Sequence, residues 1–158
     1  MAKKTKGASR FVPMASFART VGFKVVKWQR DHAELELKVG PRHINRGGFV
    51  HGGVLMTLLD AACGYAGTYH DPDEPPRLGH SVSITTSFIG NVSKGTLRTV
   101  GRKTGGGTRL FFATSEVLAP DGQVLAQAQC VFRYRSAEAA EQAVTRARRA
   151  IRPARPKR

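Results

Sequence analysis

The stretch of sequence that decides the fold reads Asn45-Arg-Gly-Gly-Phe-Val-His51-Gly52-Gly53-Val-Leu-Met-Thr-Leu-Leu-Asp60. It leads into a segment of Leu, Met and Ala, Val54 to Ala66, which predicts a helix that is apolar almost all round and buried on most sides. Two features are unusual for a purely structural helix. His-Gly-Gly opens it where Ser, Thr or Asp would cap it better. Asp60 lies near its middle among Leu and Ala, so its carboxylate needs hydrogen-bond partners or a wet pocket.

The segments on both sides of this helix read as strands, because several alternate apolar and polar residues with a period of two. The predicted strands are Phe23–Trp28, Ala33–Val39, Ser81–Ile89, Thr96–Lys103, Thr108–Leu118 and Val124–Tyr134. Hairpin turns are predicted at Gly90-Asn91, Gly105-Gly106-Gly107 and Pro120-Asp121-Gly122. Short helices are predicted at Pro13–Thr20 and from Ala137 onward. A long antiparallel sheet wrapped around one central apolar helix, an α+β fold, satisfies this order.

The charge of the chain is strongly basic and unevenly distributed. Its 158 residues carry 26 Lys and Arg against 11 Asp and Glu, a net charge of +15. Four bases lie in residues 1–10, and seven bases with two acids lie in residues 136–158. We therefore expect a basic N-terminal arm (1–10), one folded domain (11–135) and a basic C-terminal helix or tail (136–158).

Such a charge favours a polyanionic partner, either nucleic acid, anionic lipid or a phosphate-rich ligand. The sequence has no zinc-ligand spacing and no basic strand studded with aromatics, so we expect no specific nucleic-acid site. Cys63 and Cys130 lie in apolar segments and are expected to be buried free thiols of a reducing compartment. No apolar run reaches 18 residues, which predicts that no segment spans a membrane. The N-terminus has no secretion signal, so we expect a cytoplasmic location.

The arrangement of Asn45, His51-Gly52-Gly53 and Asp60 resembles that of the hotdog-fold acyl-CoA thioesterases, specifically the phenylacetate-degradation type within the 4-hydroxybenzoyl-CoA thioesterase-like superfamily. The resemblance extends from about Phe17 to Arg135. It implies hydrolysis of an aryl- or medium-chain acyl-CoA to free acid and CoA. It also implies a homodimer, and no metal or cofactor beyond the CoA carried by the substrate.

The same resemblance implies roles for individual residues. Asp60 would be the general base or the nucleophile that acts on the thioester. Gly52, together with Gly53, would donate a backbone N–H to the thioester oxygen, at the positive end of the helix dipole. Asn45 and His51 would orient water or the thioester.

The remaining site residues are less tightly aligned. Ser81 would position the water, and Ser83 competes for that role because the 69–80 loop lets the alignment slide. Pocket walls from both subunits are expected to include Met56, Leu59, Cys63, Tyr65 and Phe88. Bases expected near the phosphates of CoA are Arg46, Arg77, Lys103 and Arg109.

Helix geometry adds a constraint on the assembly. Gly52 and Asp60 are eight residues apart, which on one helix is about 12 Å along the axis. A thioester carbonyl must lie about 3 Å from its N–H donor and within short reach of the base or its water. We therefore expect Gly52 of one subunit to act with Asp60 of another, giving two sites in a two-fold dimer, alone or as part of a dimer of dimers.

Two other functions fit the same fold. A non-catalytic acyl-CoA-binding module would have no need of Asp60. A hydratase or dehydratase acting on acyl thioesters would use a His and an acid at another spacing, which the sequence lacks. The acyl group stays open between aryl-acetyl, benzoyl and medium-chain fatty acyl.

Overall fold

Helices and strands follow one another in the predicted order over residues 16–151, the range that the computed structural model describes. The helices are α1 (Ser16–Val21), α2 (Gly52–Gly67) and α3 (Ala137–Ile151), with a short 3₁₀ helix η1 at Pro41–His43. The strands are β1 (Lys24–Gln29), β2 (His32–Lys38), β3 (Gly79–Phe88), β4 (Thr96–Gly106), β5 (Leu110–Leu118) and β6 (Val124–Tyr134). Boundaries differ from the predicted ones by a few residues. The predicted arm at residues 1–10 lies outside the described range.

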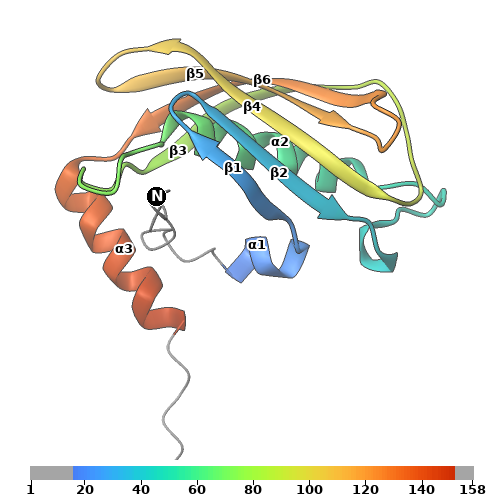
Figure 1. The fold of residues 1–158 in the computed structure, drawn as a ribbon, viewed down its shortest axis with the longest axis horizontal. Helices are drawn as coiled ribbons and strands as arrows, with labels where there is room; N and C mark the ends of the chain where they lie inside the picture. Colours follow the sequence, from blue (N-terminus) through green and yellow to red (C-terminus); the bar gives the residue numbers. More distant parts are fainter. Residues whose placement is uncertain (1–15, 152–158) are drawn as a thin grey trace, which may run out of the picture.

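The strands form one antiparallel sheet in the order β1-β2-β4-β5-β6-β3, and α2 lies along its inner face (Figure 1). Inner and outer faces alternate along each strand, as in β2, where Ala33, Leu35 and Leu37 are buried against the helix side. The strands β1 and β3 are the two edges of the sheet. The predicted α+β architecture, a sheet wrapped around one helix, is confirmed.

The predicted hairpin at Gly90-Asn91 is wrong. β3 pairs with β6 at one edge, whereas β4 pairs with β2 and β5. The connection at 89–95 instead passes beside the chain that enters α2, where the Val50 N–H donates to the Val92 carbonyl at 2.8 Å. Turn residues signal that the chain reverses, but they do not say which strand it meets next. The other two predicted turns do close hairpins, between β4 and β5 and between β5 and β6.

The core lies between α2 and the inner face of the sheet. Leu58 and Leu59 of α2 are fully buried, as is Phe111 of β5. The close approach of α2 to β4 depends on a glycine, because a Cβ at Gly101 of β4 would collide with the backbone carbonyl of Ala62 in α2. The helix therefore packs directly on the β4 backbone, which places the rest of α2 at a defined height above the sheet.

One side of α2 is not covered by the sheet, which corrects the prediction of a helix buried on most sides. Gly53 and Met56 are exposed, and Thr57, Asp60 and Gly64 are half-buried. These positions are three or four residues apart and so form one stripe along the helix. One side of α2 therefore faces the core. The other side carries the stripe, and its residues Thr57, Asp60 and Gly64 line a cavity.

The expected burial of the two cysteines is met within this fold. Cys63 of α2 and Cys130 of β6 are free and buried. No helix among the described residues is long and apolar enough to cross a bilayer.

Candidate active site

The Asp60 carboxylate of α2 and the Ser81 hydroxyl, at the start of β3, lie in direct contact. The Ser81 hydroxyl donates to Oδ1 of Asp60 at 2.5 Å. A bulge in β3 between Ser81 and Ser83 sets this contact, because it puts Ser81 opposite Phe132 on the inner face and Ser83 opposite Val131. Of the two candidate serines, Ser81 is therefore the one that contacts the carboxylate.

Asp60 and Ser81 lie at a cavity of about 440 Å³. Its walls are mostly apolar and come from α1, β1, α2, the loop after α2 and the start of β3. The larger apolar and aromatic residues that line it are Phe17, Phe23, Trp28, Tyr65, Leu78 and Phe132. Ala147 of α3 also lines it, so a segment beyond the predicted domain contributes to the wall. The arrangement places one carboxylate at the side of an apolar chamber.

Of the predicted pocket walls, the structure places only Tyr65 in this cavity. Leu59 and Cys63 are fully buried on the sheet side of α2. Met56 and Phe88 are exposed, at 39% and 54%, and do not line the cavity. Periodicity could not separate these residues, because the whole helix is apolar and both of its sides face apolar surroundings.

The other predicted group of site residues lies at the N-terminal end of α2. His51 is the N-cap, and its Nδ1 accepts the Gly53 N–H at 2.9 Å. That bond engages the Gly53 N–H within the N-cap, so the expected contact of Gly53 with substrate stays a prediction. The Gly52 N–H has no hydrogen-bond partner among residues 16–151, and the ring of Phe88 lies against this glycine.

Asn45 has a structural task in the loop before α2. Its Oδ1 accepts the N–H groups of Gly47 at 2.8 Å and Phe49 at 3.2 Å. The side-chain oxygen thereby closes the turn that presents His51 and Gly52. Gly52 and Asp60 lie on one continuous helix, so the separation of about 12 Å along its axis stands.

The predicted basic residues divide into three places. Arg77 lies at the cavity with its guanidinium 5.1 Å from the ring centre of Tyr134, and the Arg109 carbonyl accepts the Tyr134 N–H. Lys103 forms an ion pair with Asp31 at 3.6 Å. Arg46 is exposed in the loop that leads into the N-terminal end of α2.

The corner around Tyr134 contains further bases that sequence reasoning missed. They are His80, Arg133 and Arg135, which stand beside one another because β3 pairs with β6. Within the described residues, neither Arg77, Arg109, Arg133 nor Arg135 forms an ion pair with an acid. We call this group the basic corner; its five residues are Arg77, His80, Arg109, Arg133 and Arg135.

Sequence reasoning also missed the aromatic end of the cavity. Trp28, the one tryptophan of the chain, donates its indole N–H to the Tyr65 carbonyl at 2.7 Å. Its ring meets those of Tyr65, Tyr69 and His70 edge-on, at centroid distances of 6.0, 5.4 and 5.3 Å. Only a single large aromatic at the end of a predicted strand hinted at this wall, and its neighbours lie about forty residues away along the chain.

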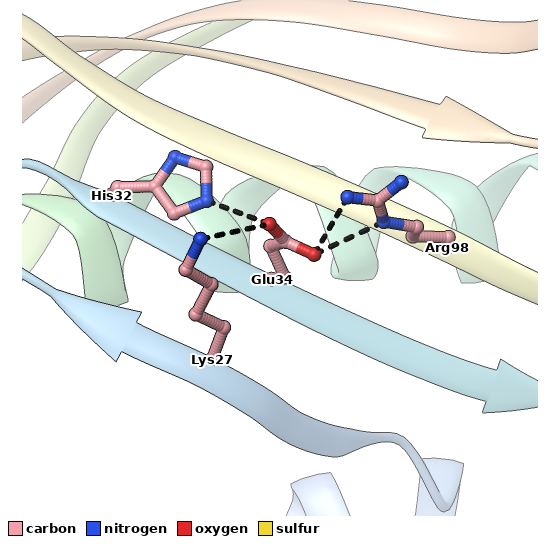
Figure 2. Close-up of polar contacts among 4 residues, drawn as sticks. All are labelled: Lys27, His32, Glu34 and Arg98. Carbon is pink, nitrogen blue, oxygen red and sulfur yellow. Dashed lines mark hydrogen bonds and ion pairs between the residues drawn. The ribbon is translucent and has the colours of Figure 1, made fainter.

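A separate cluster of charged side chains lies on the outer face of the sheet, opposite α2 (Figure 2). Glu34 accepts hydrogen bonds from His32 at 2.9 Å and from Arg98 at 2.8 and 3.0 Å, and Lys27 is 3.8 Å away. The His32 hydrogen bond, with the hydrogen bond and charge of Arg98, holds the pKa of Glu34 below its ordinary value, although burial opposes this. The cluster ties β1, β2 and β4 together and is not connected to Asp60.

A family model described as "Thioesterase superfamily" matches residues 47–126, the span from the loop before α2 to the start of β6. Among curated proteins, a Pseudomonas aeruginosa protein provisionally named an esterase is 39% identical over 54 residues. That match covers 34% of this chain and 39% of the relative, so the chain matches less than half of the relative's length.

Solved structures give a broader match. A conserved protein of Pseudomonas aeruginosa is 28% identical, with a TM-score of 0.73 over 81% of this chain and 100% of its own. Zebrafish Thioesterase Superfamily Member 2 is 26% identical, with a TM-score of 0.62 over 70% of this chain and 80% of its own. A protein of the E. coli phenylacetic acid degradation operon is 18% identical, with a TM-score of 0.67 over 76% of this chain and 84% of its own, and shares the fold.

Proposed function

The chain belongs to the thioesterase superfamily, and from that premise we propose that it hydrolyses acyl-CoA thioesters to a free acid and CoA. The observation that carries the proposal is the Asp60 carboxylate, which accepts the Ser81 hydroxyl at 2.5 Å beside an apolar cavity of about 440 Å³. A carboxylate at the side of a chamber that suits an acyl group is where a thioester carbonyl would meet its base or nucleophile.

The proposed reaction uses Asp60 in one of two ways. As a base, Asp60 takes a proton from water while the water oxygen bonds to the thioester carbon, and the C–S bond then breaks as the proton passes to the CoA sulfur. As a nucleophile, Asp60 bonds to that carbon itself, the C–S bond breaks and CoA leaves as a thiolate, which gives a mixed anhydride. Water then adds to the anhydride, which releases the acid and regenerates the Asp60 carboxylate, and a proton of that water passes to the CoA sulfur. In both, Ser81 holds the carboxylate by its hydrogen bond and helps to place the water.

The oxyanion donor is proposed to be the Gly52 N–H of a second subunit. Within one subunit the separation of about 12 Å along α2 is too long for both groups to reach one carbonyl. The Gly52 N–H lies at the positive end of α2 and has no hydrogen-bond partner within the described part of the chain, which supports this role. The homodimer is proposed to form through β3, an edge strand with exposed apolar residues Val82 and Phe88.

The basic corner is proposed to face the phosphates of CoA. Its arginines lack acidic partners within the described residues, and Arg77 itself lines the cavity. Free guanidinium groups suit bidentate contacts with phosphate. Lys103 contributes less to this proposal, because it is paired with Asp31.

A thiol-release assay across a panel of acyl-CoA esters tests the proposal. The wild-type chain is expected to release CoA thiol, and Asp60→Asn is expected to lower kcat by at least about a hundred-fold, the usual scale for removing a reacting group. Asp60→Asn should keep the fold and dimer of the wild type. Hydrolysis that survives in Asp60→Asn would rule out the role of Asp60, whereas a wild-type protein that binds acyl-CoA but releases no thiol would be a binding module.

A further inference from the structure

The loop before α2 contains a buried histidine, His43, to which the proposed reaction gives no task. The residue is only 3% exposed and ends the 3₁₀ helix η1. It also begins a short hairpin, residues 43–51, that leads into α2. Backbone hydrogen bonds close this hairpin: the His51 N–H donates to the His43 carbonyl at 2.8 Å, and the Asn45 N–H to the Phe49 carbonyl at 2.7 Å. His43 is therefore bonded directly to the residue that precedes Gly52.

The hydrogen bonds of the His43 ring fix which of its nitrogens carries the proton. The Gly40 N–H donates to Nδ1 at 2.9 Å. A ring nitrogen that accepts a hydrogen bond carries no hydrogen, so the proton is on Nε2. Nε2 lies 2.8 Å from the Val21 carbonyl and donates to it. The Arg42 Nε, 3.2 Å from Nε2, also carries a hydrogen, so this contact is not a hydrogen bond in that tautomer.

The two ring bonds of His43 join different parts of the molecule. Gly40 is three residues away in the same loop, whereas Val21 is 22 residues away and is the last residue of α1. Carbonyls in the last turn of a helix have no partner within the helix, and the His43 ring supplies a donor for one of them. The bond to Val21 is thus the one that fastens the loop to another element of the fold.

Hydrogen bonds run without a break from α1 to the N-terminal end of α2. They lead from the Val21 carbonyl to the His43 ring, and from the His43 carbonyl to the His51 N–H, which is one residue before Gly52. An oxyanion donor has to lie about 2.7–3.1 Å from the oxygen that it stabilises. A misplacement of about 1 Å can lower a rate by about 10²-fold. The position of the Gly52 N–H therefore depends on how firmly this loop is held.

We propose that His43 is a positioning residue, which holds the Gly52 N–H where a thioester carbonyl in the shared site needs it. This inference rests on the proposed function, because it takes Gly52 as the oxyanion donor. It adds a buried side chain that acts through the backbone of its own loop. Since Gly52 of one subunit is proposed to act with Asp60 of the other, a defect at His43 should impair the site that its own Gly52 completes.

Three substitutions in the full-length protein test the role of the ring bonds. His43→Leu keeps much of the bulk and removes both bonds, so kcat should fall about ten- to a hundred-fold while KM changes little. His43→Gln puts an amide N–H near the place of Nε2, retains a donor for Val21 and should restore most of kcat. Arg42→Ala, at the exposed neighbour, is the matched control and should match the wild type. A wild-type kcat in His43→Leu would overturn the proposal.

Mixed dimers, purified through two different tags, show which site His43 acts on. A dimer of His43→Leu with Asp60→Asn has both defects in one site and none in the other, so about half of wild-type activity is expected. A dimer of His43→Leu with Gly52→Pro has a defective donor in each site and should not recover. If His43 acted on Asp60 of its own subunit, the pattern would be the reverse. If it only stabilised the fold, neither dimer would recover, and either result would overturn the proposal.

The dimer of Gly52→Pro with Asp60→Asn separates this inference from the proposed function. If that dimer recovers activity while His43→Leu with Asp60→Asn does not, the shared site stands and His43 does not position Gly52. If neither dimer recovers, the shared site is wrong and the role of His43 falls with it.

Hydrogen exchange of the His51 N–H, followed by NMR, tests the same contact without turnover. His43→Leu should speed this exchange several-fold, whereas Arg42→Ala should not. Unchanged exchange in His43→Leu would overturn the positioning role. Faster exchange in His43→Leu, together with a wild type that releases no thiol from any ester, would overturn the proposed function and leave the anchoring of the loop by His43 standing.

A second variant covers the case in which His43→Leu does not form a dimer. His43→Asn keeps an acceptor near the place of Nδ1 for the Gly40 N–H and loses only the bond to Val21. It should lower kcat and give the same pattern in mixed dimers as His43→Leu. Loss of the dimer in both variants would overturn the proposal, because His43 would then hold the fold and not the donor.

Discussion

The Ser81 hydroxyl donates to the Asp60 carboxylate at 2.5 Å across 21 residues of sequence. A hydrogen bond to a charged group is among the stronger polar contacts in a protein. It holds the Asp60 carboxylate at the cavity, and the second oxygen, Oδ2, has no hydrogen-bond partner among residues 16–151. The proposed chemistry therefore depends on β3 as well as on α2.

Ser81→Ala should lower kcat for acyl-CoA hydrolysis by about ten-fold or more, since hydrogen bonds to charged groups contribute about 1.5–3 kcal/mol. Ser83→Ala is the matched control, because Ser83 is exposed on the other side of the β3 bulge. Steady-state kinetics of both variants measure the difference. Equal effects of the two substitutions would contradict a specific role for Ser81.

Sites shared between subunits should restore activity in mixed dimers. Gly52 is the first residue of α2, where proline is tolerated, so Gly52→Pro removes the proposed donor N–H without removing the helix. Gly52→Pro and Asp60→Asn should each be nearly inactive alone. Co-expressed at equal levels, they should recover about a quarter of wild-type activity, since half of the dimers are mixed and each has one intact site.

Separate differently tagged preparations of the two variants, assayed side by side without subunit exchange, provide the control. If mixed dimers purified through both tags are as inactive as either parent, Gly52 and Asp60 do not act across an interface.

Charge on the β3 edge should break the proposed dimer. Val82 is 57% exposed on β3, and Val26 is 49% exposed on β1, the opposite edge of the sheet. Val82→Glu should shift the protein to monomer in analytical ultracentrifugation, because a buried unpaired carboxylate opposes association. Val26→Glu should leave the assembly as in the wild type. A dimer that survives Val82→Glu and dissociates with Val26→Glu would place the interface at β1.

Gly101→Ala should lower the free energy of unfolding by about 1–3 kcal/mol, the usual cost of overpacking a core. The added methyl group would collide with the Ala62 carbonyl of α2, a backbone atom that cannot turn aside. Gly105→Ala lies on the same strand with open space around its Cβ, and should have little effect. Urea unfolding of both variants gives the comparison, and equal stability would mean that α2 does not pack on β4 as closely as the structure has it.

Acid should weaken the outer-face cluster around Glu34 (Figure 2). The pKa of Glu34 is lowered below its ordinary 4.5 in the folded chain, mainly by the hydrogen bond from His32. A carboxyl group of this kind stabilises the fold above its unfolded pKa, and the contribution disappears as the pH falls from about 4.5 through the lowered value. Thermal unfolding between pH 7 and pH 3 measures this loss.

Glu34→Gln should lower Tm at pH 7 and flatten its dependence on pH below 4.5. Glu36→Gln, at the exposed Glu36 two residues further along β2, is the matched control and should follow the wild-type curve. If the slopes of both variants match the wild type, the Glu34 cluster does not contribute to acid sensitivity.

The local sequence determined much of this protein. Alternating residues located several of the strands, and the apolar run from Val54 located α2 with Asp60 inside it. The eight-residue spacing of Gly52 and Asp60 already required two subunits under the proposed mechanism. These features could be predicted from the sequence alone, because they depend on periods of two and of 3.6 residues, which are properties of a few neighbouring positions.

Only the tertiary structure decided which distant groups meet. A period of two puts Ser81 and Ser83 on one face, and the β3 bulge, which no local residue signals, separates them. The placement of β3 beside β6 brings the basic corner together, and the packing of β1 against the end of α2 sets Trp28 beside His70. Such contacts are set by how the sheet closes around the helix, because burial of apolar surface acts between elements and not along the chain.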